Sequence, residues 1–146
     1  MVDSTWEERV RVLNQAGYAR YDESTARTLG DTATLLLDRW DGDLRRLREE
    51  ARRDPGVERR LLKEAKGMGD VGASMFLREV QAAWPEVAPM LDGKVIKGAR
   101  ALGLGSDPGR IARLVPAARL PALSAALVRV DLEGTAEEVI AAADRS

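Results

Sequence analysis

The residues Gly67, Met68 and Gly69 suggest a binding site, because two glycines here flank a single methionine. They interrupt a helical apolar pattern that resumes at once, within the stretch KEAKGMGDVGASMFL from Lys63 to Leu77. Glycine readily takes the positive φ values of a tight turn, and it lets another backbone approach closely. Such a turn exposes N–H groups at the start of the next helix, where the helix dipole favours an anion. The spacing therefore predicts either a phosphate-binding hairpin or a plain reversal of the chain between two helices.

Basic side chains stand near this hairpin and again further along the chain. They are Lys63, Lys66 and Arg78, followed by Lys94, Lys97 and Arg100. Each phosphate neutralised by such a side chain adds salt-dependent affinity for DNA. The same spacing is typical of the solvated face of an amphipathic helix, so both interpretations stay open. Asp70 argues against DNA at the hairpin, because its carboxylate repels phosphate.

The elements that must position these residues are helices. Apolar residues recur at helical rather than alternating spacing, and alanine, leucine, arginine and glutamate dominate the composition. We therefore expect an all-α fold, a single compact helical domain over residues 1–146. Within it we expect a helical half over residues 16–84, which holds a helix-hairpin-helix at about residues 61–77, and a second helical subdomain over residues 90–146.

Residues typical of helix N-termini mark where the helices of the second half of the chain begin. Asp92 stands directly before a helical stretch, which favours a helix N-cap. Ser106, Asp107 and Pro108 are a start signal for another helix, with the proline where its missing N–H does no harm. Thr135 and Glu138 have the spacing of a capping box for the last helix.

Composition excludes several kinds of chemistry. The 146 residues include no cysteine and no histidine, which removes disulfides, thiolate-held iron–sulfur clusters, the usual zinc sites and histidine acid–base catalysis. We therefore expect no cofactor and no metal. With 23 basic and 24 acidic residues the net charge is −1, so any anion site must be local. No signal-peptide pattern and no apolar run of membrane-spanning length is present, which predicts a cytoplasmic protein with no membrane partner.

Three segments of the chain resemble, in the same order, parts of the helix-hairpin-helix (HhH-GPD) endonuclease III-like DNA glycosylases. They are AGYARYDESTARTLGDTATLLLDRWDGDLRRL, the hairpin from Lys63 to Leu77, and PMLDGKVIKGARALGL, which together cover about residues 16–104. The resemblance implies double-stranded DNA as partner, extrusion of a base into a pocket between helical subdomains, and cleavage of its N-glycosidic bond in base excision repair.

Gly67 and Gly69 match the hairpin glycines of that family, and Met68 matches the apolar plug between them. With the nearby cations, the expected DNA-binding residues are Gly67, Met68, Gly69, Lys63, Lys66, Lys94 and Lys97. Asp92 matches the aspartate that stabilises the cationic sugar or positions the attacking water, so it is the expected catalytic residue. A carboxylate suits this task because positive charge develops on the sugar ring. The N-cap role of Asp92 can hold together with the catalytic one.

The chain also departs from the family pattern. Val71 stands where bifunctional members carry the lysine that attacks the sugar, and the four cluster cysteines are missing. An active protein would therefore be a monofunctional DNA glycosylase without lyase activity. Several family helices have no counterpart before Gly17, so we expect a protein partner or self-association to complete the base pocket. The alternative is a non-catalytic helix-hairpin-helix module that binds DNA or a protein.

Overall fold

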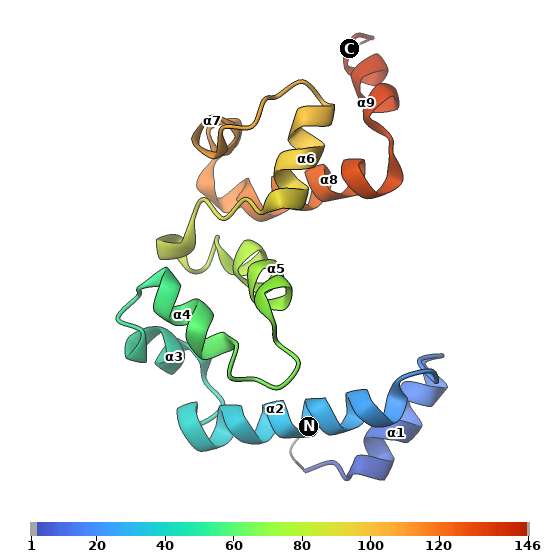
Figure 1. Ribbon diagram of the computed structural model, residues 1–146, viewed down its shortest axis with the longest axis vertical. Coiled ribbons are helices and arrows are strands. Elements are labelled where there is room, and N and C mark those ends of the chain that lie inside the picture. Colours follow the sequence, from blue (N-terminus) through green and yellow to red (C-terminus); the bar gives the residue numbers. More distant parts are fainter. Residues whose placement is uncertain (1–2, 146) are drawn as a thin grey trace. The chain divides into compact units, whose positions relative to one another are not determined.

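The computed structural model describes residues 3–145 of the chain (Figure 1). Over these residues the protein is all α and contains no strand, as the helical spacing predicted. The chain forms two compact units, the first ending at Asp70 and the second beginning at Val71. This boundary lies within the expected helix-hairpin-helix, whereas the division expected from the sequence, between residues 84 and 90, lies inside the second unit.

The first unit is built on one long helix, α2 (Asp22–Trp40), with α1 (Trp6–Gln15) packed against it. Figure 1 shows α1 beside the N-terminal half of α2. Two shorter helices, α3 (Leu44–Glu50) and α4 (Pro55–Leu62), follow in the chain. Their order places α4 directly before the hairpin. The buried apolar residues of this unit are Ala26, Trp40, Leu47, Ala51, Leu61 and Leu62.

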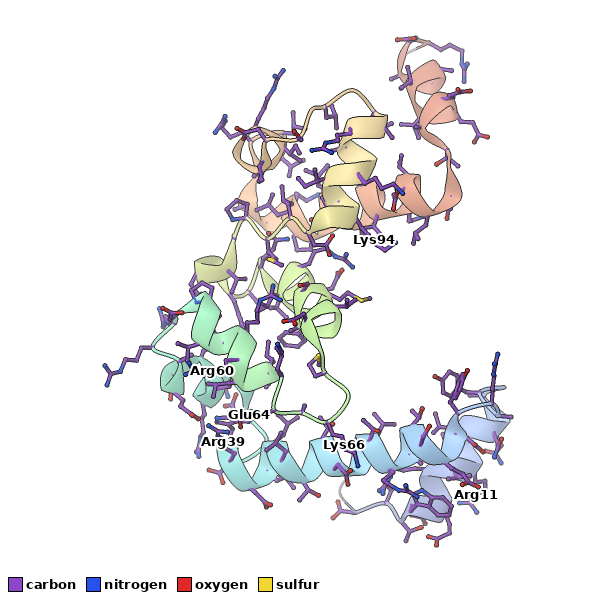
Figure 2. The ribbon with its side chains drawn as sticks, viewed as in Figure 1. Arg11, Arg39, Arg60, Glu64, Lys66 and Lys94 are labelled. Atoms are coloured by element: carbon purple, nitrogen blue, oxygen red, sulfur yellow. The ribbon has the colours of Figure 1, made fainter. Side chains whose placement is uncertain are left out.

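A polar cluster fastens the end of α2 to the elements that follow it. The buried Trp40 donates from its indole nitrogen to Oε2 of Glu50 over 2.7 Å. Arg39 pairs with Oε1 of Glu50 over 2.6 Å and also with Glu64, and Figure 2 shows Arg39 and Glu64 close together. The Arg39 guanidinium, and after it the Trp40 indole, lowers the pKa of Glu50 below its ordinary value. Glu50 is therefore held in the charged form that this cluster needs.

The second unit contains most of α5 (Asp70–Val80), followed by α6 (Gly93–Ala101), α7 (Pro108–Ala112), α8 (Leu120–Glu133) and α9 (Ala136–Ala143). Short 3₁₀ turns, η1 (Pro85–Val87) and η2 (Ala117–Arg119), lie between them. Helices α6 and α8 pack against each other, and the core of the unit contains Val95, Ala99, Ile111 and Leu127. This pair of helices fixes the N-terminal end of α6, where Asp92 lies.

Gly98 lets α6 and α8 come this close. A Cβ atom on Gly98 would lie 1.9 Å from the backbone oxygen of Leu127 in α8, a distance that real Cβ atoms do not reach. The glycine is buried in the middle of its helix, where it lowers helix propensity by about 1 kcal/mol relative to alanine. Close approach of the two backbones explains its presence.

Every helix between residues 3 and 145 is too short or too polar to cross a membrane.

Candidate functional site

The hairpin after α4 needs a glycine at one of its two positions. Gly67 has φ +85°, in the left-handed region that glycine adopts most readily, and a Cβ there would lie 3.6 Å from Cγ2 of Thr28 in α2. Gly69 has no positive φ, and a Cβ there would meet nothing within 4 Å. The positive φ expected of a tight glycine turn is therefore found at Gly67 and not at Gly69. Met68 is half-buried, and its amide donates to the Ala65 carbonyl over 2.9 Å.

Lys63 and Asp70 close the hairpin segment with an ion pair. Nζ of Lys63 lies 2.8 Å from Oδ1 of Asp70, and Nη1 of Arg59 donates to the Asp70 carbonyl oxygen over 3.3 Å. The Lys63 ammonium lowers the pKa of the Asp70 carboxyl below its usual value. A phosphate that approaches this point must share Lys63 with Asp70.

Lys66 lies on the other side of the hairpin, beside α2. Its Nζ is 3.6 Å from Oδ2 of Asp31, and both side chains are exposed. Figure 2 shows Lys66 near the middle of α2. The hairpin therefore rests against α2 at two points, through Lys66 and through the approach of Gly67 to Thr28.

The last turns of α4 carry a cationic depression that leads into the hairpin. It has a volume of about 160 Å³ and is lined by Gly56, Arg59, Arg60 and Lys63. Three of these four residues are cations within five positions of the chain. Arg59 and Arg60 were not among the DNA-binding residues expected from the sequence. Their spacing from Lys63 in RRLLK could have identified them, because it places all three on neighbouring positions of a helix surface.

A strained turn precedes α4 and carries two more arginines. Arg52 and Arg53 are exposed and have φ of 52° and 57°, in the left-handed region. A residue with a Cβ pays roughly 1–2 kcal/mol in this region. The turn ends at Asp54, which caps α4 by accepting from the Val57 amide over 2.9 Å. Strain of this kind is often found at functional positions.

Asp92 is held on both of its carboxylate oxygens. Oδ1 accepts from the amides of Lys94 and Val95 over 3.0 and 3.1 Å, so Asp92 is the N-cap of α6, as its position predicted. Oδ2 accepts from Nη1 of Arg78 in α5 over 2.8 Å. The Asp92 side chain is 16% exposed and the Arg78 side chain 8%. The carboxylate is engaged with backbone amides and a nearly buried guanidinium at a helix start.

Gln81 fixes the segment that leads to Asp92. Its side-chain amide is buried and donates to the carbonyl oxygens of Arg78 and Met90 over 2.8 and 3.2 Å. The side-chain oxygen accepts from the Met90 amide over 2.9 Å. These bonds tie the end of α5 to the residues just before Asp92.

Lys94 and Lys97 both pair with one carboxylate of α8. Their Nζ atoms lie 3.8 and 2.8 Å from Asp131, whose side chain is 7% exposed, and Lys97 lowers the pKa of this carboxyl. Figure 2 shows Lys94 where α6 and α8 meet. The two lysines therefore help to join the helices as well as carrying charge on the surface.

The structure thus brings the expected residues together in two groups. In the first unit, Lys63 lines the cationic depression of α4, whereas Lys66 and Gly67 lie against α2 on the other side of the hairpin. In the second unit, Asp92 lies with Arg78 at the start of the helix that carries Lys94 and Lys97. The described part of the chain contains no group of three or more acidic side chains able to hold a metal ion.

Comparison of the chain with protein-family models, with curated proteins and with solved structures finds no match.

Proposed function

We propose that this chain binds double-stranded DNA through phosphate contacts, as a helix-hairpin-helix module that performs no chemistry on the bases. The observation that supports it is the depression lined by Arg59, Arg60 and Lys63 directly before the hairpin. Such a surface neutralises phosphates and positions a protein on the duplex without reading its sequence. Because the net charge of the chain is −1, the molecule as a whole does not attract DNA. The attraction must come from this local concentration of cations.

The ion pair between Lys63 and Asp70 does not prevent this binding. Both side chains are exposed, and water and salt screen an exposed pair so that it contributes little to stability. A DNA phosphate can therefore replace Asp70 as the partner of Lys63 at small cost. Arg60 is exposed and free to turn toward a phosphate, since its influence on Glu50 acts through charge at a distance.

The proposal excludes base removal because of the surroundings of Asp92. A carboxylate that stabilises a sugar cation, or activates a water, needs an oxygen directed at the reacting atoms. Both oxygens of Asp92 already accept hydrogen bonds, two from amides and one from Arg78. The arrangement suits a residue that begins α6 and joins it to α5.

A second candidate is a monofunctional DNA glycosylase of base excision repair. It is supported by the order of the three segments that resemble that family and by the position of Asp92 at the start of α6. Cleavage would proceed by attack of water and leave the DNA strand intact, because Val71 stands at the position of the lysine nucleophile. A partner or a second copy of the chain would complete the base pocket.

One experiment separates the two candidates. Duplexes that each carry a single damaged or mismatched base are incubated with the protein, and abasic sites are measured by alkaline strand cleavage. The DNA-binding proposal expects binding of every duplex with no abasic product. Abasic product that disappears in Asp92→Asn, while binding is retained, would instead establish the glycosylase.

The cationic depression is tested with matched charge variants. Arg60→Gln should weaken binding of a fluorescein-labelled duplex at low salt by roughly fivefold or more, since one phosphate contact is lost. Arg11→Gln removes the same charge from exposed α1 (Figure 2) and should leave affinity nearly unchanged. Equal effects of the two variants would refute the assignment of the site to α4.

A further inference from the structure

A second cavity lies between α1 and α2, away from the cationic depression of α4. It has a volume of about 540 Å³, within the range of pockets that hold small organic ligands. Its lining residues are Ser4, Trp6, Arg9, Arg27, Gly30, Asp31 and Thr34. The residues from α2 recur at helical spacing and so form one face of that helix. The cavity shares no lining residue with the depression of α4.

Two walls of this cavity are fixed by bonds to the backbone. The Trp6 indole nitrogen donates to the Glu23 carbonyl oxygen over 3.2 Å. Nε of Arg9 donates to the Ala26 carbonyl oxygen over 2.9 Å, and its Nη1 donates to the carbonyl oxygen and hydroxyl of Ser4. The aromatic ring and the guanidinium are therefore oriented before any ligand arrives.

Gly30 provides the space that Arg9 occupies. It lies in the interior of the 19-residue helix α2, where glycine is unfavourable. A Cβ at this position would lie 2.6 Å from Nη2 of Arg9, so a larger residue would displace the guanidinium. The glycine keeps Arg9 against α2, at the wall of the cavity.

Arg27 gives the cavity a positive charge that the protein does not neutralise. Its side chain is exposed, and it forms no hydrogen bond or ion pair with any residue that the structure describes. The carboxylate of the cavity, Asp31, is shared with Lys66 at 3.6 Å. An anionic ligand would therefore find one guanidinium available and a second already in position.

We propose that this cavity binds a small ligand that joins a planar aromatic ring to an anionic group, as a nucleoside monophosphate does. The ring stacks on Trp6, and the phosphate is held by Arg27 with Arg9, since guanidinium groups match phosphate geometry. The hydroxyl groups of Ser4 and Thr34 can bond the polar edge of the ligand. The same chemistry is offered by a free mononucleotide and by the 5′-phosphorylated end of a DNA strand. This site is independent of the proposed duplex binding by α4.

The test measures binding of AMP and TMP to the full chain by titration calorimetry. Adenosine, which lacks the phosphate, and ribose 5-phosphate, which lacks the ring, should each bind at least about tenfold more weakly than AMP. Arg27→Gln should weaken AMP binding by about tenfold, and Arg11→Gln, which removes an exposed charge of α1 outside the cavity, should not change it. Gly30→Ala should also weaken binding while the helix persists, because alanine favours helix and moves Arg9.

Two further arms complete the design. If a 5′-phosphorylated single-stranded oligonucleotide displaces AMP and its unphosphorylated form does not, the ligand is the phosphorylated end of a DNA strand. If neither oligonucleotide displaces AMP, the ligand is a free mononucleotide. Undetectable AMP and TMP binding at millimolar concentration would overturn the proposal, as would affinity that is equal for AMP and adenosine or unchanged in both Arg27→Gln and Gly30→Ala. The affinity for duplex DNA should not change in Arg27→Gln. The mononucleotide proposal and the duplex-binding proposal can therefore fail independently of each other.

Discussion

Arg78 donates from Nη1 to Oδ2 of Asp92 over 2.8 Å, and both side chains are largely removed from water. The bond joins α5 to the start of α6, and the other oxygen of Asp92 caps that helix. Loss of a cap costs about 1 kcal/mol. Arg78 also donates from Nε to Oε1 of the exposed Glu79 over 3.2 Å, so loss of Asp92 would leave the nearly buried guanidinium with one carboxylate partner instead of two, at a further cost of about 1–2 kcal/mol. The ion pair therefore joins α5 to the start of α6. In the DNA-binding proposal, Asp92 has this structural role and no catalytic one.

Asp92→Ala should lower the free energy of unfolding by about 2–3 kcal/mol, because it removes the cap and one of the two carboxylates that pair with Arg78. Asp107→Ala is the matched control, since Asp107 caps α7 through the Arg110 amide at 2.7 Å and should cost only about 1 kcal/mol. Urea denaturation measures both. If the two substitutions cost the same, the bond between Arg78 and Asp92 adds nothing to stability.

The two hairpin glycines should respond differently to alanine. Gly67→Ala should destabilise the protein by about 1 kcal/mol, because alanine is strained at φ +85°. Gly69→Ala should leave stability unchanged or raise it by about 0.5 kcal/mol, since its backbone is unstrained and the space around it is open. Thermal unfolding of the pair checks this, and an equal loss in both variants would show that the turn requires two glycines.

Gly98→Ala should be among the most damaging single substitutions in the second unit. The new Cβ cannot fit beside the Leu127 carbonyl unless α6 and α8 separate, which should cost about 3 kcal/mol. Gly93→Ala, at the first residue of the same helix, meets nothing within 4 Å and should stay within about 0.5 kcal/mol of wild type. A folded Gly98→Ala protein of unchanged stability in urea would contradict the close helix contact.

The cluster of Arg39, Trp40 and Glu50 predicts a pH dependence. Because the pKa of Glu50 is lowered in the folded state, its contribution is complete well above its ordinary value of 4.5 and is lost as the pH falls through the folded value. Glu50→Gln should therefore destabilise the protein at pH 7 and progressively less as the pH falls below about 4.5. Unfolding by urea at several pH values tests this, with exposed Glu49→Gln on the same helix as control. A cost for Glu50→Gln that does not vary with pH would contradict the charged cluster.

The sequence predicted those features that depend on neighbouring residues. Asp92 caps its helix as expected, and Asp107 caps α7 within the start signal of residues 106–108, because a cap needs only a side-chain oxygen and the amides two or three positions later. The capping box of Thr135 and Glu138 was wrong. Thr135 makes no side-chain cap bond, since its φ of −91° and ψ of 17° lie outside the extended region that places a cap oxygen over the helix end.

The features that the sequence could not supply join residues far apart in the chain. The partner of Lys94 and Lys97 is Asp131, more than thirty positions away, and the partner of Lys66 is Asp31. Nothing in the spacing of these lysines reveals such partners, because the packing of α6 on α8 and of the hairpin on α2 brings them together. The cavity beside Trp6 also depends on packing, in this case of α1 on α2.

The salt dependence of duplex binding tests the central proposal most directly. The logarithm of the association constant of wild-type protein for an undamaged duplex should fall linearly with the logarithm of the salt concentration, with a slope of about −3 for three phosphate contacts. The double variant Arg60→Gln/Lys63→Gln should reduce the magnitude of that slope by about two, and Arg11→Gln should leave it unchanged. No measurable duplex binding at low salt, or a slope that the double variant does not alter, would contradict DNA binding through α4 and the hairpin.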